Sequence, residues 1–320
     1  MRIQNSSRRS FFKFLAATPL LSQIAAREVY AQAATAVGKN PRRNVYTRLG
    51  VKTVINCRGT WTYLSGTLEF PEVRQAQIDA AAHFVNMFDL QRAVGHRLSE
   101  LTGAESGIVT SGAAGALSAA TAACMAGTDD KYIWQLPDTT GMKHEVIMAG
   151  GRSAFDSAIR LTGAKLVLAY SPEELTNAIN ENTAMIYTTD LGDKLQQQLA
   201  IAKDHKVPML LDDAAGIPPA ENARLYAKMG IDLYCFSGGK GLCGPQCSGL
   251  LLGRKDLIEA ALMNCNPREG AVCRPMKVGK EEKVPDHIEL VSMTIQPGEE
   301  IIAGQRLRAV LRAAQKKAAA

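Results

Sequence analysis

The sequence predicts an α/β protein whose mostly parallel sheet is covered by helices on both faces. Short apolar runs alternate with helical stretches from about residue 104 onward, which is typical of this class. The runs are almost continuously apolar, as in strands that are buried on both faces. With 320 residues, 46% of them hydrophobic, the chain is long enough for one large domain or for one large and one small domain.

The first elements are predicted before and around the first strand. The stretch "VKTVINCRGT" follows the polar linker "GKNPRRN" and is expected to open the folded part. Helical periodicity then runs from about Val73 to Leu101. "AESGIVTSG" predicts a short strand ending in a turn, and "AAGALSAATAACMAG" predicts a small-residue helix that stops at Gly127.

Five further apolar runs predict buried strands: "HEVIMAG", "AKLVLAY", "TAMIYTTD", "VPMLLDD" and "IDLYCFSGG". Helical stretches, including "SPEELTNAINE" and "DKLQQQLAIAKDH", lie between them. In sheets of this kind, ligands bind beyond the carboxyl ends of the strands. The loops that follow these strands are therefore where functional residues are expected.

The first 33 residues have the features of an export signal. A twin-arginine stretch, "SRRSFFK", precedes the apolar run "FLAATPLLSQIAA", and "AQA" offers a small-residue cleavage site after Ala33. The run is too short and too interrupted to span a bilayer. A tail with a chance arginine pair is the alternative interpretation. The pattern favours twin-arginine export of a folded protein to the periplasm, with residues 34–43 as a linker.

Charge and cysteine content exclude several classes of function. The 37 Lys and Arg against 31 Asp and Glu give a formal net charge of +6, spread along the chain, so no nucleic-acid footprint is predicted. Seven cysteines without repeated CxxC or Cys/His spacing argue against a disulfide framework or a zinc site, although Cys243 and Cys247 could pair in an oxidising compartment. A GxGxxG or P-loop pattern for nucleotide binding is absent.

Three loops after predicted strands carry unusual residues. "TSGAAGA" joins a strand to a helix through small residues whose N–H groups can approach an anion, although a structural turn would look the same. "VPMLLDD" ends a buried strand in Asp212 and Asp213, where a carboxylate needs a cationic partner unless it caps the next helix. "SGGKG" places Lys240 in a glycine turn after another buried strand.

The three loops together match the requirements of one cofactor. A desolvated lysine attacks carbonyls and forms Schiff bases, whereas a lysine that binds phosphate or extends to solvent is the simpler interpretation of Lys240 alone. Pyridoxal 5'-phosphate needs an anion cradle, a carboxylate beside its pyridinium nitrogen and an amine that forms an imine. The sequence therefore predicts a pyridoxal-phosphate enzyme.

Several stretches resemble the selenocysteine synthase-like family of fold-type I pyridoxal-phosphate enzymes. They are "INCRGTWT", "ELTGAESGIVTSGAAGALSAATAACMAG", "VPMLLDDAAGIPP", "DLYCFSGGKGLCGPQCSGLLLGRKDLI" and "RPMKVGKEE". The family includes L-seryl-tRNA(Sec) selenium transferase and the D-glucosaminate-6-phosphate ammonia-lyase branch. The resemblance implies a cofactor-binding large domain over residues 44–282 and a reduced C-terminal small domain over residues 283–320, where most of the family's small domain is missing.

The resemblance also implies a role for each matching position. Lys240 would form the internal aldimine, and Asp212 rather than Asp213 would keep the pyridine nitrogen protonated. The implied contacts with the cofactor phosphate come from Ser111, Gly112, Ala113 and Ser237. Phe155 would lie beside the cofactor ring. Arg58 and Arg274 would hold the substrate's carboxylate or phosphate. The two arginines could equally be structural ion-pair partners.

The activity implied by the resemblance is α,β-elimination, of the ammonia-lyase type, on a small amino acid or amino-sugar acid. The family also implies a homo-oligomer, a dimer or larger. Two alternatives remain open. Selenium transfer to seryl-tRNA is one, against which an export signal argues. A non-catalytic binding protein with the same fold is the other, motivated by the shortened C-terminal region.

Overall fold

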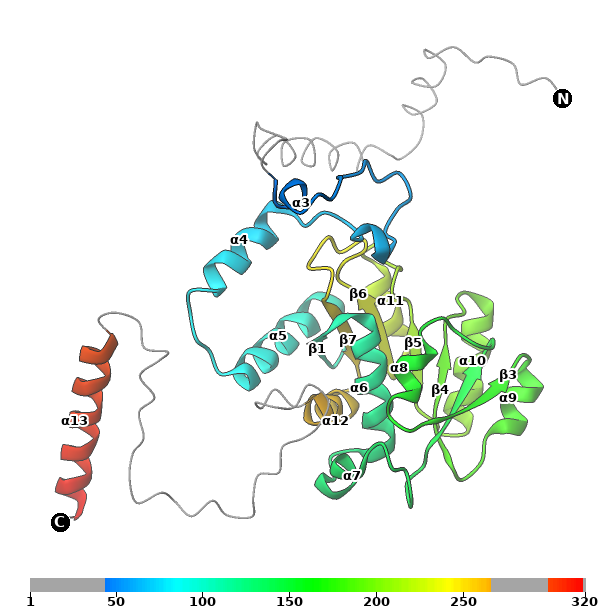
Figure 1. Cartoon of the computed structure of the whole chain (residues 1–320). Coiled ribbons are helices and arrows are strands. Elements are labelled where there is room, and N and C mark those ends of the chain that lie inside the picture. Colours follow the sequence, from blue (N-terminus) through cyan, green and yellow to red (C-terminus); the bar gives the residue numbers. More distant parts are fainter. Residues whose placement is uncertain (1–43, 266–298, 319–320) are drawn as a thin grey trace, which may run out of the picture. The chain divides into compact units, whose positions relative to one another are not determined.

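The computed structural model describes residues 44–265 and 299–318. The chain divides into two compact units, Met1–Met276 and Lys277–Ala320, and each is described by itself. The predicted export signal and linker, and the segment that contains Arg274, lie outside the described residues. Figure 1 shows the first unit as a sheet surrounded by helices.

A seven-stranded sheet forms the centre of the first unit, in the order β1-β7-β6-β5-β4-β2-β3. The strands are β1 (Ser106–Thr110), β2 (Glu145–Ala149), β3 (Lys165–Ala169), β4 (Thr183–Thr188), β5 (Met209–Asp212), β6 (Leu233–Ser237) and β7 (Gly249–Gly253). β7 is antiparallel to both of its neighbours, and the remaining pairs are parallel. All strands except β7 therefore run in one direction, and their carboxyl ends share one edge.

The predicted α/β class with a mostly parallel sheet is confirmed, and β1 to β6 coincide with the six predicted strands. The strand β7 is not among the predicted strands. This strand returns between β1 and β6, so that its first residue lies at the same edge as their last residues: Gly249 pairs with both Thr110 and Ser237.

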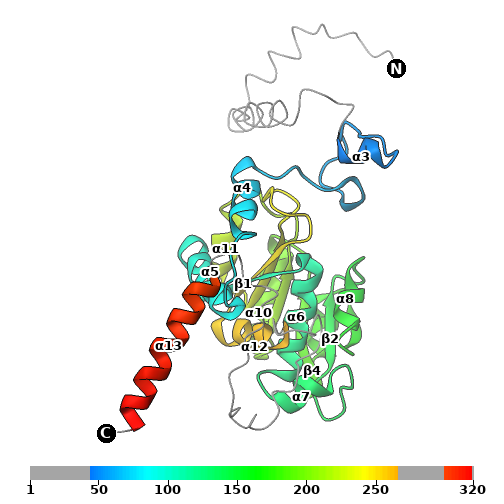
Figure 2. The same ribbon diagram turned by 60° about the vertical axis from the view of Figure 1, so that its left-hand side comes forward.

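Helices cover both faces of the sheet (Figures 1 and 2). One face packs against α6 (Gly112–Ala126), α8 (Asp156–Arg160) and α12 (Lys255–Cys265). The other packs against α5 (Met87–Thr102), α9 (Pro172–Ala178), α10 (Asp193–Asp204) and α11 (Asn222–Met229). Shorter elements are α3 (Val45–Arg48), η2 (Thr62–Leu64), α4 (Pro71–Ala80) and α7 (Asp130–Gln135).

Side chains of the central strands alternate between two hydrophobic clusters. Leu210 and Cys235 belong to the cluster on the α6 face, whereas Leu211 and Tyr234 belong to the cluster on the α11 face. Successive residues of a strand point to opposite faces. Asp212 lies two residues after Leu210 on β5, so its side chain points to the face of the sheet that α6 covers.

The helix α6 follows β1 directly and begins at the carboxyl edge. Its small side chains let it lie close to the strands, and Ala116 and Ala120 are completely buried. It ends as predicted at Gly127, whose N–H donates to the carbonyl of Ala123. The amino end of a long, buried helix is thereby placed beside the ends of the parallel strands.

The periodic stretch from Val73 to Leu101 forms two helices, α4 and α5, rather than one. Asn86 caps α5, because its side-chain oxygen accepts hydrogen bonds from the N–H groups of Phe88 (2.9 Å) and Asp89 (3.2 Å). The stretch "VKTVINCRGT", expected to open the folded part, contains no helix or strand. Between residues 44 and 94, Gly66 is the only buried residue.

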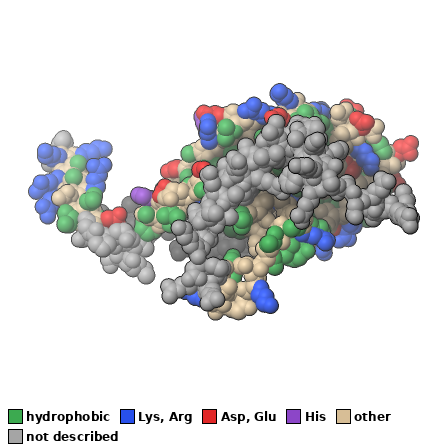
Figure 3. Space-filling view, turned by 90° about the horizontal axis from the view of Figure 1, so that it is seen from above, with side chains coloured by type: hydrophobic (Ala, Val, Ile, Leu, Met, Phe, Trp, Pro, Cys, Tyr) green, Lys and Arg blue, Asp and Glu red, His purple; other side chains and the backbone are tan. Residues whose placement is uncertain are grey.

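The described part of the second unit is the helix α13 (Glu299–Ala318). Its apolar residues Ile301, Ile302, Val310 and Leu311 are exposed. Its basic side chains, blue in Figure 3, are Arg306, Arg308, Arg312, Lys316 and Lys317. Across residues 44–265 and 299–318, no helix is long and apolar enough to cross a membrane.

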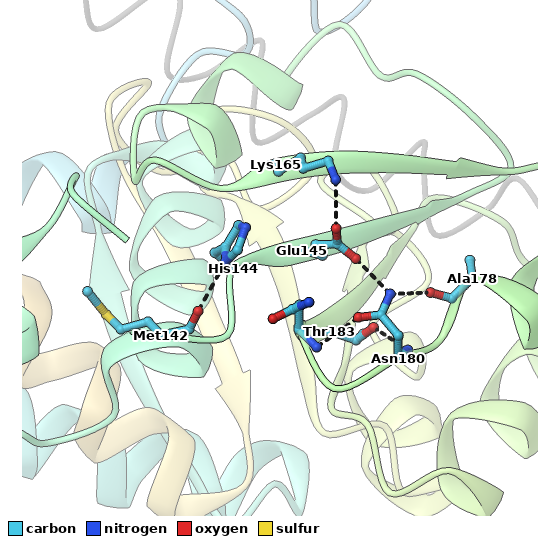
Figure 4. A network of polar contacts seen from close by, with 8 residues as sticks. Met142, His144, Glu145, Lys165, Ala178, Asn180 and Thr183 are labelled. Carbon is cyan, nitrogen blue, oxygen red and sulfur yellow. Dashed lines mark hydrogen bonds and ion pairs between the residues drawn. The ribbon is translucent and has the colours of Figure 1, made fainter. Parts of the chain in front are cut away.

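An ion pair between a buried carboxylate and an exposed lysine stabilises the opposite, amino edge of the sheet (Figure 4). Glu145, 8% exposed, accepts hydrogen bonds from Lys165 Nζ and from Asn180 Nδ2, both at 2.8 Å. The bond from Lys165, followed by the bond from Asn180, lowers the pKa of the Glu145 carboxyl below its ordinary value of 4.5. The charged form is therefore favoured by folding.

Glu145→Gln is expected to lower the free energy of unfolding at neutral pH by about 1 kcal/mol, a small value because Lys165 is largely exposed. A depressed folded-state pKa contributes stability above the unfolded value and loses it as the pH falls. The difference from the wild type should therefore shrink below pH 4.5. Urea denaturation of both proteins above and below this pH measures the difference in unfolding free energy. An equal difference at the two pH values would contradict a stabilising role of the Glu145 charge.

Candidate active site

The carboxyl edge of the sheet brings together most of the residues predicted for the site. Ser237 ends β6, Asp212 ends β5 and Ser111 follows the end of β1. Cys235 pairs with Asp212 across β6 and β5, and Ser237 pairs with Gly249 of β7. Lys240 follows β6 after two glycines. The three loops that the sequence singles out thus lie at neighbouring strand ends.

Ser111, Gly112 and Ala113 form the turn from β1 into α6. The side chain of Ser111 does not cap the helix, so it does not occupy the N–H groups of the first turn. Thr110 Oγ1 donates to the carbonyl of Gly112 (2.8 Å) and holds the turn. The first turn of a helix of 15 residues offers aligned N–H groups and a positive dipole end, which suit a phosphate.

This turn can approach the sheet because β7 begins with a glycine. A Cβ on Gly249 would lie 2.5 Å from the carbonyl oxygen of Gly112 and 2.7 Å from the backbone nitrogen of Ala113, both closer than real contacts allow. Only a residue without a side chain fits here. The position of the helix start relative to β6 therefore depends on Gly249.

Gly249→Ala is expected to displace the turn and to weaken binding of pyridoxal phosphate by the protein about five- to 100-fold, which corresponds to an overpacking cost of about 1–3 kcal/mol. Titration of apoprotein with the cofactor measures the dissociation constant. Gly304→Ala is the control, because Gly304 lies within the helix α13 with open space around it and no left-handed backbone. Unchanged binding in Gly249→Ala would contradict the proposed cradle.

The carboxylate of Asp212 is held by three donors. Its Oδ2 accepts from the hydroxyl of Tyr187 (3.0 Å), and its Oδ1 accepts from the N–H of Ala214 (3.2 Å) and from the thiol of Cys235 (3.6 Å). Burial, followed by the charge of Asp212, raises the pKa of Cys235 well above its ordinary value. The thiol therefore stays protonated and acts as a donor.

The neighbouring carboxylate, Asp213, is engaged elsewhere. Its Oδ2 accepts a 2.5 Å hydrogen bond from the hydroxyl of Tyr226 on α11, on the other side of the sheet. Burial, followed by this bond, raises the pKa of Tyr226. Of the two adjacent carboxylates, Asp212 is the one on the α6 side with the phosphate cradle.

Lys240 is half-buried in a turn with tight backbone packing. A Cβ on the following residue, Gly241, would lie 2.5 Å from the carbonyl carbon of Ile217 and 2.7 Å from Cδ of Pro218. The charge of Lys240 favours the thiolate of Cys235, opposite to the effect of Asp212. Lys240 and Asp212 therefore have opposite effects on the same buried thiol, and both lie at the carboxyl edge, Asp212 at the end of β5 and Lys240 after β6.

Thr67 clamps the backbone on both sides of Lys240. Its hydroxyl lies 2.7 Å from the carbonyl oxygen of Lys240 and 3.1 Å from that of Gly239, and its N–H donates to Gly239 (3.0 Å). The N–H of Phe70 donates to the carbonyl of Cys243 (3.1 Å). The segment around residues 67–70 therefore fixes the lysine turn, although it is far away in sequence.

Phe155 precedes α8 in the loop after β2. Its side chain is 50% exposed, and its N–H donates to the hydroxyl oxygen of Ser153 (3.2 Å). The following residue, Asp156, is buried and accepts hydrogen bonds from Arg152, which lowers the pKa of the Asp156 carboxyl. The loop is firmly held, with the aromatic ring left accessible at the carboxyl edge.

Of the two arginines predicted to bind substrate, only Arg58 lies among the described residues. Arg58 is exposed, and its guanidinium carbon lies 5.2 Å from the centre of the Trp61 ring, which is a cation–π contact; the described residues show no ion pair for it. Arg58 belongs to the segment that leads to Thr67. Arg274 lies outside the described residues.

The residues at this edge fit pyridoxal phosphate. A helix start that Ser111 leaves uncapped suits the phosphate, the carboxylate of Asp212 suits a protonated ring nitrogen, and the amine of Lys240 suits the aldehyde. A surface hollow lined by residues 139–144 and 181–182 lies at the opposite edge, near Figure 4's network. It contains none of these groups.

Three residues absent from the sequence-based predictions contact the candidate site residues: Tyr187, Thr67 and Gly249. A tyrosine within a buried strand signals a hydroxyl in need of a partner, so Tyr187 could have been noticed. The contact of Thr67 with Lys240 spans 173 positions and leaves no local pattern.

Comparison with known proteins agrees with this geometry. The model of the aminotransferase class-V family matches residues 98–267. A solved structure of D-glucosaminate-6-phosphate ammonia-lyase superposes with a TM-score of 0.63 and 33% sequence identity, over 68% of this chain and 63% of that one. The residues that the family model matches contain all seven strands and the loops at Ser111, Asp212 and Lys240.

Three curated relatives are similar over three quarters of the chain. D-glucosaminate-6-phosphate ammonia lyase of Salmonella typhimurium is 33% identical over 75% of this chain and 68% of its own length. 5'-C-glycyluridine monooxygenase-decarboxylase of a Streptomyces species is 34% identical over 74% of this chain and 62% of its own length. L-seryl-tRNA(Sec) selenium transferase of Desulfovibrio desulfuricans is 27% identical over 75% of this chain and 58% of its own length. The alignments thus span about three fifths to two thirds of the relatives.

The expected relation to selenium transferase is confirmed in its coarser form, with higher identity to the ammonia lyase. The matched family model, the solved structure and the arrangement of Lys240, Asp212 and the start of α6 agree with one another. The chain belongs to the aminotransferase class-V family, whose members use pyridoxal phosphate.

Proposed function

We propose that this protein is a pyridoxal-phosphate-dependent lyase that releases ammonia from an amino-sugar acid. The observation that carries the proposal is the meeting of Lys240, Asp212 and the uncapped start of α6 at one edge of the sheet. The similarity to D-glucosaminate-6-phosphate ammonia lyase supports the reaction and the substrate class.

The proposed reaction converts a 2-amino-3-hydroxy acid into a 2-oxo acid and ammonia. The bond between Cα and its hydrogen breaks, and the hydroxyl on Cβ leaves with a proton as water. Water then replaces the amino group, a proton is added at Cβ, and ammonia departs. Water lost and water gained balance, and no oxidant or reductant is needed.

Each step assigns a task to a residue of this chain. When bound, the cofactor supplies an electron sink for the breaking Cα–H bond. Lys240 binds the aldehyde in the resting protein and, once displaced by substrate, moves the proton away from Cα. Asp212 holds the proton on the ring nitrogen, and the turn at Ser111–Ala113 binds the phosphate, with Ser237 beside it.

Substrate anions are assigned to Arg58 and Arg274. A guanidinium can hold a carboxylate or a phosphate through two parallel hydrogen bonds. The accessible, stacked guanidinium of Arg58 supports its part in this assignment. Phe155 is assigned to the cofactor ring, because an accessible aromatic side chain at this edge can stack on it.

Formation of ammonia and of a 2-oxo acid tests the proposed activity. Purified mature protein loaded with cofactor is incubated with 2-amino-2-deoxy sugar acids, with and without a terminal phosphate, and both products are measured. Equal amounts of ammonia and oxo acid would support elimination. A bound cofactor without turnover of any of these acids would favour a non-catalytic binding protein. Transfer of selenium to seryl-tRNA would instead favour a selenium transferase.

Export through the twin-arginine pathway is part of the proposal. The order of arginine pair, apolar run and small-residue site in the first 33 residues supports it. Replacing Arg8 and Arg9 together by lysine should retain the protein in the cytoplasm, as fractionation would show. Equal amounts in the periplasm for both forms would refute this part.

A homo-oligomer is also proposed, supported by the exposed apolar side chains of the segment before α5. Ile55, Ile78 and Phe84 are between 66% and 93% exposed, and Gly66 is the only buried residue between positions 44 and 94. Figure 3, seen from above, shows exposed hydrophobic side chains in green. A surface of this kind marks a protein–protein contact. Light scattering during gel filtration should give at least twice the mass of one chain.

A further inference from the structure

The carboxylate of Asp212 accepts a hydrogen bond from Tyr187, a residue with no role in the reaction proposed above. Tyr187 comes from β4, the strand next to β5, and is 1% exposed. Its hydroxyl donates to Oδ2 of Asp212 at 3.0 Å. The remaining donors, Ala214 and Cys235, both contact Oδ1. Tyr187 is thus the one side chain shown to engage the second oxygen of this carboxylate within the described residues.

The Phe155 loop also acts on this tyrosine. The N–H of Phe155 donates to Oγ of Ser153 at 3.2 Å, and the hydroxyl of Ser153 lowers the pKa of Tyr187, against the larger effect of burial, which raises it. Donation by Ser153 favours the phenolate, whereas donation by Tyr187 to Asp212 disfavours it. Ser153 therefore strengthens Tyr187 as a donor to Asp212.

Tyr187 stays a donor under ordinary conditions. Burial, followed by the negative charge of Asp212, raises the pKa of its hydroxyl above the ordinary value of 10.0. A phenol in this environment keeps its proton and points it at the carboxylate. Hydrogen bonds to the charged form of a carboxyl group favour that form.

We propose that Tyr187 is a positioning residue that orients Asp212, so that this carboxylate holds the proton on the ring nitrogen of the cofactor. The inference rests on the proposed role of Asp212 at that nitrogen. Without the hydroxyl, the half-buried carboxylate loses its donor on Oδ2 and is no longer held in one orientation. It would then hold the proton on the ring nitrogen less well.

The structure offers a matched control on the other side of the sheet. Tyr226 donates to Asp213 in the same way, at 2.5 Å, and this pair lies on the α11 side. Tyr187→Phe and Tyr226→Phe each remove one buried hydroxyl from one aspartate of an adjacent pair. A general effect of such a loss on stability would appear in both variants, whereas an effect on the cofactor nitrogen would appear in the first alone.

The test uses pyridoxal phosphate labelled with nitrogen-15 in its ring, bound to the full mature protein, and nitrogen NMR at one neutral pH. The wild type should give the signal of a protonated ring nitrogen. Tyr187→Phe should move it towards the unprotonated position and raise the dissociation constant for the cofactor about tenfold, the size of one hydrogen bond to a charged group. Tyr226→Phe should change neither.

Ser153→Ala is a second variant, because it weakens Tyr187 as a donor without removing an atom next to Asp212. It should move the signal in the same direction by a smaller amount, including where Tyr187→Phe fails to fold. A protonated wild type with an unmoved signal in the variants would overturn the role of Tyr187 alone. An unprotonated ring nitrogen in the wild type would overturn the proposed role of Asp212 and this inference with it.

Discussion

Lys240→Ala is expected to remove the covalent link between protein and cofactor and to lower kcat for ammonia release by about 10³-fold or more. The amine is the group that binds the aldehyde and later moves the proton, and acid–base groups of this kind typically contribute 10²- to 10⁴-fold. Borohydride reduction followed by mass spectrometry of peptides should find the cofactor on Lys240 in the wild type and nowhere in the variant.

Two further variants separate this role from a simple positive charge. Lys240→Arg keeps the charge without an amine able to form an imine, so it should behave like Lys240→Ala. Lys203→Ala removes a lysine on α10 whose Nζ donates to the carbonyl of Met229 (2.8 Å), and it should keep both the adduct and the activity. Activity retained in Lys240→Arg would instead support the phosphate-binding interpretation.

The fold could be predicted where the sequence pattern is local. The buried strands β1 to β6 are short apolar runs separated by helical stretches, and each is found where it was expected. The strand β7 escaped prediction because "SGLLLG" is short and follows a loop, and because nothing local shows that it runs antiparallel between β1 and β6. Because β7 begins against the turn at Gly112 and Ala113, Gly249 must be a glycine.

The candidate site could be predicted in its loops but not in its supports. Asp212 and Lys240 stand out because a charged residue at the end of an apolar strand needs a partner or a purpose. Thr67 and Tyr187 act through contacts with residues 173 and 25 positions away, which only the folded chain shows. The exposed, stacked position of Arg58 likewise follows from its neighbour Trp61 and from no spacing rule.

Asp212→Asn is expected to lower kcat by about 10²- to 10³-fold, the usual cost of removing one electrostatic contact to developing charge. Asparagine has nearly the same shape but no charge, so it cannot favour a protonated ring nitrogen. The lysine turn is held by Thr67 and by packing around Gly241, independently of Asp212. The borohydride adduct on Lys240 should therefore persist while turnover is lost.

Asp213→Asn is the matched control, since it removes the adjacent charge on the side of α11. The lost partner of this carboxylate is Tyr226, at 2.5 Å, and not a group of the site. Breaking the bond should lower the free energy of unfolding by about 1–3 kcal/mol and leave kcat within a few-fold of the wild type. If the two variants lost turnover equally, the distinction between the two aspartates would fail. If Asp213→Asn lost more, the ring nitrogen would have to be assigned to Asp213 instead.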